Sequence, residues 1–111
     1  MEIKDATYTI KALGNTLEFS GQLADQNYVK VENFLTEFEE SVSSDNIVIN
    51  FYNLEFLNSS GIKTISNYVR DTAKKNIEVL VNYKHTWQKI SLSMLAFLKP
   101  EGAVKITKKE A

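Results

Sequence analysis

The chain of 111 residues has no cysteine, one proline, four glycines and a single histidine, His85. The lack of cysteine excludes disulfides, thiolate zinc sites and cysteine nucleophiles. One histidine cannot build a histidine-based metal cluster within one chain, so no metal or other cofactor is expected. His85 follows a predicted strand and precedes a predicted helix, which indicates a residue of a solvated loop or of a helix start.

Neither sign of charge predominates, because 13 Lys and Arg stand against 14 Asp and Glu. Proteins that bind nucleic acid mainly through its phosphates need a basic cluster, so no direct nucleic-acid partner is expected. No apolar run reaches the roughly 18 residues of a membrane helix, and Met1–Asp5 lacks the apolar core of a signal peptide. We therefore expect a cytoplasmic protein without membrane insertion.

The motifs of common enzyme classes are also missing. The four glycines are scattered and form neither a phosphate-binding loop nor a dinucleotide-binding loop. No serine lies in a G-x-S-x-G elbow, and a catalytic triad would have to use His85. The carboxylates of Glu37, Glu39 and Glu40 belong to the solvent side of a predicted helix. The sequence therefore favours a protein that is not an enzyme.

Alternating β-formers predict the strands. Residues 6–11 and 16–20 alternate around Gly14-Asn15, which predicts a hairpin, and Gly21 is expected to end its second strand. Short apolar runs then predict a strand at 46–51, buried on both faces, and further strands at 77–81 and 104–107.

Apolar residues recur every three or four positions in three other segments, which predicts amphipathic helices. The first starts near Asp25, the second at Ser59-Ser60-Gly61 after a loop at 52–58, and the third covers 86–98. Their core-facing stripes are predicted to be Tyr28, Val31, Phe34, Leu35, Phe38 and Val42, then Ile62, Ile65, Val69 and Ala73, and finally Trp87, Ile90, Met94 and Leu98.

This order of elements predicts an α/β fold. An opening β-hairpin is followed by alternating helices and strands, which gives a mostly parallel central sheet with helices packed on it. The length allows one domain, and no linker or repeat divides the chain. Residues 1–111 are therefore expected to form a single domain.

The segment Asn58-Ser59-Ser60-Gly61 stands at the predicted start of the second helix. Asn and Ser are preferred N-caps because their side-chain oxygens accept the first free backbone N–H groups. A glycine there lets other groups approach the backbone closely. On these residues alone, a helix cap is the simpler interpretation, with no further role for the serines.

Placed in the order of elements, the same segment resembles a known family. An apolar strand, a loop ending in a hydrophobic residue and Asn58-Ser59-Ser60-Gly61 at a helix start resemble the STAS domains, most closely the bacterial anti-anti-sigma factors (anti-sigma factor antagonists). Leu17–Leu23 is similar to the second strand of that family with its glycine. Ile47–Gly61 is similar to the central strand and switch loop, and Trp87–Leu98 stands in the place of the third helix. The resemblance implies a single STAS-like domain.

The resemblance also implies a function, that of a partner switch. In the family, a GHKL-type serine kinase that doubles as an anti-sigma factor phosphorylates a serine at this helix start, and a PP2C-type phosphatase removes the phosphate. The acceptor position falls on Ser59, with Ser60 as the weaker candidate. Unmodified Ser59 would permit binding of the partner and phospho-Ser59 would block it. The implied partner-binding residues are Asn58, Ser59, Ser60, Gly61, Ile62 and Lys63.

Two alternatives stay open. One is a non-switching STAS scaffold in which Ser59 only caps the helix, and the other is a STAS-type sensor of a small molecule or lipid. Position 58 is Asn, where the best-known members of the family carry Asp. This difference points to a divergent branch whose partner need not control a sigma factor.

Overall fold

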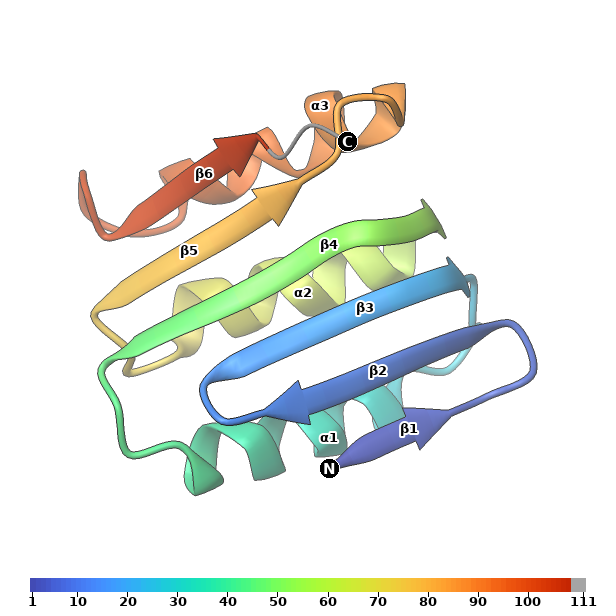
Figure 1. Ribbon diagram of the computed structural model, residues 1–111, viewed down its shortest axis with the longest axis horizontal. Coiled ribbons are helices and arrows are strands. Elements are labelled where there is room, and N and C mark those ends of the chain that lie inside the picture. The colour runs from blue at the N-terminus through green and yellow to red at the C-terminus, as the bar shows by residue number, and fades with distance from the viewer. Residues whose placement is uncertain (109–111) are drawn as a thin grey trace.

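In the computed structural model, which describes residues 1–108, six strands form one mixed sheet in the order β1-β2-β3-β4-β5-β6 (Figure 1). The first three strands pair antiparallel, and β3 to β6 pair parallel. This arrangement confirms the predicted α/β class, the opening hairpin and the mostly parallel sheet. The strands are β1 Glu2–Lys4, β2 Tyr8–Leu13, β3 Thr16–Leu23, β4 Asn46–Leu57, β5 Asn76–Val81 and β6 Val104–Lys108.

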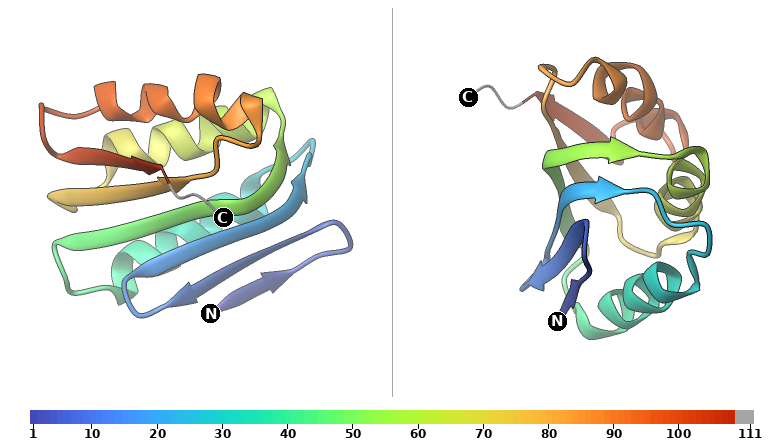
Figure 2. Two further views of the ribbon diagram at one scale, coloured as in Figure 1. Left: turned by 45° about the horizontal axis from the view of Figure 1, so that its top comes forward. Right: turned by 90° about the vertical axis from the view of Figure 1, so that its right-hand side faces the viewer.

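The helices are α1 Val29–Ser41, α2 Ser59–Asp71 and α3 Thr86–Ser91, followed by a short 3₁₀ helix, η1 Ser93–Phe97. Each helical segment connects two neighbouring parallel strands, and all of them cover the same face of the sheet (Figure 2). Each connection from β3 to β6 moves one strand further in the same direction along the sheet. Right-handed connections that move in the same direction place their helices on the same face of the sheet.

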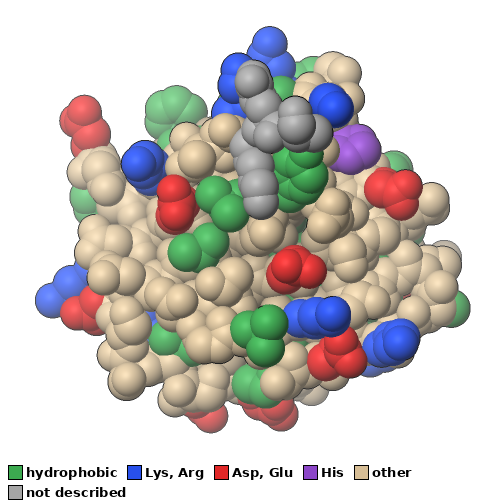
Figure 3. Space-filling model, in the orientation of Figure 1, with side chains coloured by type: hydrophobic (Ala, Val, Ile, Leu, Met, Phe, Trp, Pro, Cys, Tyr) green, Lys and Arg blue, Asp and Glu red, His purple; other side chains and the backbone are tan. Residues whose placement is uncertain are grey.

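The opposite face of the sheet is open. It carries mostly polar groups, with scattered charged and hydrophobic side chains (Figure 3). Along β4 the burial alternates, with Ile47 and Ile49 buried and Val48 and Asn50 half-buried. The prediction that this strand is buried on both faces is therefore wrong, because helices cover only one side.

The turn between β2 and β3 has the predicted form. Leu13 pairs with Thr16, and Gly14 adopts a φ of 58° in the two-residue turn. Gly21, however, does not end β3, which continues to Leu23. It has a φ of 86° and lies where the register between β3 and β4 shifts, so it forms a bulge inside the strand.

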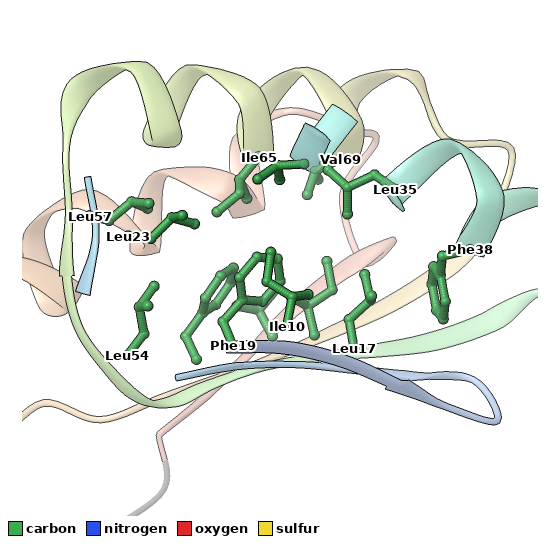
Figure 4. Packing of buried hydrophobic residues seen from close by; sticks show 14 of the residues in the cluster. Ile10, Leu17, Phe19, Leu23, Leu35, Phe38, Leu54, Leu57, Ile65 and Val69 are labelled. Atoms are coloured by element: carbon green, nitrogen blue, oxygen red, sulfur yellow. The ribbon is translucent and has the colours of Figure 1, made fainter. Parts of the chain in front are cut away.

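The core lies between the sheet and the helical segments that cover one of its faces (Figure 4). Leu35 and Phe38 of α1 and Ile65 and Val69 of α2 point toward the sheet, where the rings of Phe19 and Phe51 pack with their centres 5.0 Å apart. All six stripe residues predicted for the first helix are buried, although α1 begins at Val29 and not near Asp25. In the second stripe Ile65 and Val69 are buried and Ile62 is half-buried, whereas Ala73 is exposed and follows the helix.

The predicted stripe of the third helix is correct for Trp87 and Leu98, which are half-buried against the core, and wrong for Ile90 and Met94. Ile90 and Met94 are 68% and 63% exposed, and the residues that are buried in the core are Gln88, Leu92 and Leu95. Gln88 is fully buried because distant backbone groups satisfy its amide. Its Nε2 donates to the carbonyl oxygens of Phe51 and Leu54, and its Oε1 accepts from the N–H of Asn82.

Candidate functional site

The second helix starts directly at the end of β4. Residues 52–57 were predicted as a loop, but they extend β4 as far as Leu57. Asn58 is the one residue between the end of β4 and Ser59, the first residue of α2. The backbone N–H of Asn58 donates to the carbonyl oxygen of Leu23 at 3.3 Å, which joins this junction to the end of β3. The serines are therefore held by sheet and helix rather than by a loop.

A cap at this helix start was predicted, and in the structure it is Asn58 and not Ser59. Its Oδ1 accepts the N–H of Gly61 at 2.9 Å and the hydroxyl of Tyr28 at 2.5 Å. Its Nδ2 donates to the carbonyl oxygen of Asp25 at 3.0 Å. Both ends of the amide thus have partners inside the domain, so the side chain of Asn58 fixes the helix start.

Gly61 is buried beneath the first turn of α2. A Cβ at this position would lie 2.3 Å from Cδ1 of Leu57 and 2.7 Å from the hydroxyl oxygen of Tyr28. The glycine is needed because the first turn of the helix rests directly on these two side chains. The absence of a side chain at Gly61 thus allows Leu57 and Tyr28 to support the first turn of α2 from the protein interior.

Ser59 and Ser60 are exposed on the first turn of α2, and Lys63 is exposed at the start of the next turn. Ile62 is half-buried beside them. Among the described residues, the Ser59 hydroxyl has no hydrogen-bond partner, so it can accept a modification without breaking a contact. The structure therefore places all six predicted residues at the start of α2, with Asn58 as the N-cap and the other five in the first turn and the beginning of the second. It leaves three of them exposed.

The electrostatics of this turn favour an anion. The first turn of the 13-residue helix α2 contains no acidic residue, and Lys63 lies four positions after Ser59. Free N–H groups and the helix dipole give the N-terminus a partial positive charge, and residues four apart are neighbours on a helix surface. A phosphate on Ser59 would be received by the helix and by the ammonium of Lys63.

Three further residues support the cap. The hydroxyl of Tyr8 donates to Oδ2 of Asp25 at 2.8 Å, and the carbonyl oxygen of Asp25 accepts from Asn58. Burial and the carboxylate of Asp25 raise the pKa of Tyr28, which keeps its phenol a neutral donor. The sequence indicated Tyr28 only as a core residue, and no local pattern marks the contact of its hydroxyl with residue 58.

Elsewhere, a hollow of about 390 Å³ is lined by residues of α1 and α2. Its lining includes the acidic side chains of Glu32, Glu39, Glu40 and Asp71. His85 precedes α3 as its N-cap residue, in agreement with the predicted helix start. In the part of the chain that is described, no helix is long and apolar enough to cross a membrane.

The comparison with protein families decides the identity of the fold. The model of the STAS domain matches residues 8–100, which includes the hairpin, the cap and the third helix. The chain belongs to the STAS domain family. This STAS domain is also similar to the crystal structure of apo-SiaC from Pseudomonas aeruginosa, with a TM-score of 0.69 and 14% sequence identity over 96% of this chain and 97% of that one. No curated protein matches the sequence.

Membership in this family supports a regulatory module of the STAS type. At 14% identity, the likeness to apo-SiaC concerns the fold alone. The STAS match includes the strand that ends at Leu57 and the helix that begins at Ser59.

Proposed function

We propose that this STAS domain is a phospho-regulated protein-binding module of a bacterial partner-switching pathway, similar in type to the anti-sigma factor antagonists. Ser59 is the phosphoacceptor, and Ser60 is the weaker candidate. The observation that carries the proposal is the exposed Ser59 hydroxyl, without a partner among the described residues, on a helix turn that Asn58 and Gly61 fix from below.

The unmodified turn offers a surface that a protein can cover. Ser59, Ser60, Ile62 and Lys63 would contact the partner, while Asn58 and Gly61 hold the turn in place. Burying a neutral hydroxyl in an interface costs little when it gains a hydrogen bond, whereas a phosphate brings a charge of about −1.5 to −2 that must be desolvated. Unmodified Ser59 therefore permits binding and phospho-Ser59 blocks it.

The proposed partners follow from this chemistry and from the family. A GHKL-type serine kinase that is also the sequestered target would bind the unmodified turn in the cytoplasm, and a PP2C-type phosphatase would restore it. The phosphate acts on docking and not on folding, because the N-terminus of α2 stabilises an anion.

The test compares three baits in lysate of the native host: wild type, Ser59→Asp and the matched control Ser60→Asp. We expect a GHKL-type kinase to bind wild type and Ser60→Asp and to be lost from Ser59→Asp. Titration calorimetry with that purified kinase, using unmodified and enzymatically phosphorylated chain, then measures the switch directly. Equal affinity of the two forms would contradict the proposal and leave a constitutive scaffold.

The sensor alternative has its own measurement. A ligand that binds only the folded state raises the melting temperature. A thermal-shift screen with nucleotides and common metabolites is expected to give no shift. A reproducible shift would favour the sensor.

A further inference from the structure

Three large apolar side chains are exposed along α3 and η1. Ile90, Met94 and Phe97 are 68%, 63% and 86% exposed, and they follow one another at spacings of four and three residues. This spacing places them on one side of the helical segment. The opposite side, with Gln88, Leu92 and Leu95, is buried. We call Ile90, Met94 and Phe97 the α3 stripe.

The chain segment that carries the α3 stripe contains basic but no acidic side chains. The chain has no Asp or Glu between Val79 and Pro100, but it has Lys84, Lys89 and Lys99 there. Lys84 and Lys89 are exposed and form the basic rim of the stripe. Lys99 does not belong to this rim, because it donates to the carbonyl oxygen of Thr72 at 2.7 Å and its charge, in addition to a hydrogen bond from Arg70, lowers the pKa of the Asp71 carboxyl group. A basic rim around an apolar centre favours a partner with acidic residues around its own apolar side chains.

We propose that the α3 stripe binds an acidic amphipathic helix of a separate partner protein. This inference goes beyond the proposed function, because the residues involved lie on α3 and η1 and not on the turn with Ser59. An amphipathic helix presents apolar side chains at the same spacing of three and four residues, so it can align with the stripe along its length.

A second copy of this chain is a poorer occupant of the α3 stripe. In a two-fold dimer the same surface meets itself, so a patch that carries Lys84 and Lys89 would lie against a patch that carries the same two positive charges. Like charges opposed in this way disfavour the contact.

The test is a titration of the ¹⁵N-labelled full chain, followed by NMR. The probe is a synthetic helical peptide with Leu at every third or fourth position and Glu at its polar positions, and the matched peptide carries Lys in place of each Glu. We expect the Glu peptide to shift amide signals of residues 84–100 and the Lys peptide to bind at least about tenfold more weakly. Equal binding of both peptides, or shifts outside this segment, would overturn the proposal.

Variants assign the binding to particular side chains. Phe97→Ser is expected to weaken binding of the Glu peptide at least about tenfold without lowering the melting temperature, because the ring is exposed. Leu13→Ser, at a residue that is 75% exposed in the distant hairpin, is the matched control and is expected to bind like wild type. Unchanged binding by Phe97→Ser would refute the assignment.

Two further measurements separate this proposal from other outcomes. Sedimentation of the chain alone is expected to give a monomer, and a dimer that Phe97→Ser dissociates would assign the α3 stripe to a second copy instead. The Ser59→Asp variant is expected to bind the Glu peptide with wild-type affinity. Failure of the phosphorylation switch would therefore leave this result unaffected.

Discussion

The hydroxyl of Tyr28 lies 2.5 Å from Oδ1 of Asn58, although the two residues are 30 positions apart in the chain. Tyr28 precedes α1 and Asn58 precedes α2, so this contact joins the starts of two helices at the same edge of the sheet. The same Oδ1 caps α2 through the N–H of Gly61. The orientation of the turn that carries Ser59 therefore depends on a side chain of the preceding helical unit.

Tyr28→Phe tests this contact. The substitution removes the donor to Asn58 and keeps the buried ring, so we expect a loss of about 1 kcal/mol in the free energy of unfolding. Chemical denaturation measures it. Val29→Ala, at the next residue and 55% exposed, is the control and should change stability by less than about 0.5 kcal/mol. Equal effects of the two variants would mean that the hydroxyl adds nothing to the cap.

Asn58→Asp and Asn58→Ala distinguish the contribution of the acceptor oxygen of the Asn58 amide from that of its donor nitrogen. Alanine removes every side-chain contact and is expected to cost about 1–2 kcal/mol, the usual range for a lost N-cap. Aspartate keeps the acceptor for Gly61 and Tyr28 but places an oxygen opposite the carbonyl of Asp25, which now receives a hydrogen bond from Nδ2. We expect its denaturation midpoint to lie between those of alanine and wild type. A midpoint at or above wild type would show that the contact with Asp25 does not select Asn at this position.

Gly61→Ala is expected to destabilise the domain although alanine is the better helix former. The new Cβ would meet Leu57 and Tyr28 at 2.3 and 2.7 Å, and overpacking of this kind costs about 1–3 kcal/mol, against a gain in helix propensity of at most about 1 kcal/mol. Thermal unfolding measures the balance. Ser60→Ala, an exposed site in the same turn, is the control and should be neutral or slightly stabilising. A Gly61→Ala variant as stable as wild type would show that the first turn of α2 can move away from Leu57 and Tyr28.

Much of the fold could be predicted because its signals are local. The hairpin needs only alternating residues around Gly14-Asn15, and the cap needs only Asn58 before a helical pattern. The burial of Gln88 could not be predicted from local signals. It depends on carbonyl oxygens of Phe51 and Leu54, more than 30 positions earlier, so the apolar period alone wrongly assigned Ile90 and Met94 to the buried side of the third helix.

The candidate site also has one part that the sequence could indicate and another part that only the fold reveals. The six residues of the site adjoin one another in sequence, so a motif could indicate them. The supports, Tyr8, Asp25 and Tyr28, meet the cap only after α1 and the sheet have packed. The division of the six into exposed and supporting residues also needs the fold, because it is set by contacts from Leu57 and Tyr28.

Ser59→Asp is expected to separate binding from stability. A negative charge at the first position of α2 interacts favourably with the helix dipole, which is worth about 0.3–1 kcal/mol, and Lys63 lies on the next turn. The melting temperature should therefore stay the same or rise, while affinity for the kinase falls. Thermal unfolding of Ser59→Asp beside Ser59→Ala measures the first part. A marked drop in melting temperature would mean that the phosphate acts by disturbing the fold.

Glu39 joins the end of α1 to the end of α2 and makes stability depend on pH. Burial alone would raise the pKa of this carboxyl group, but hydrogen bonds from Thr72, the N–H of Ala73 and Tyr68, together with the charge of Lys74, lower it below its ordinary value of 4.5. A carboxyl group whose pKa is lowered by folding stabilises the folded state above its unfolded pKa. That contribution is lost as the pH falls through the lowered pKa.

Glu39→Gln should therefore lower the free energy of unfolding by about 1–2 kcal/mol at pH 7, and the difference from wild type should shrink as the pH falls from about 5 to 3. Urea denaturation at several pH values measures it. Glu37→Gln, two residues earlier on the same helix and exposed, is the matched control and should follow wild type. A difference between Glu39→Gln and wild type that stays constant from pH 7 to pH 3 would show that the contacts of Glu39 stabilise the helix ends without its charge.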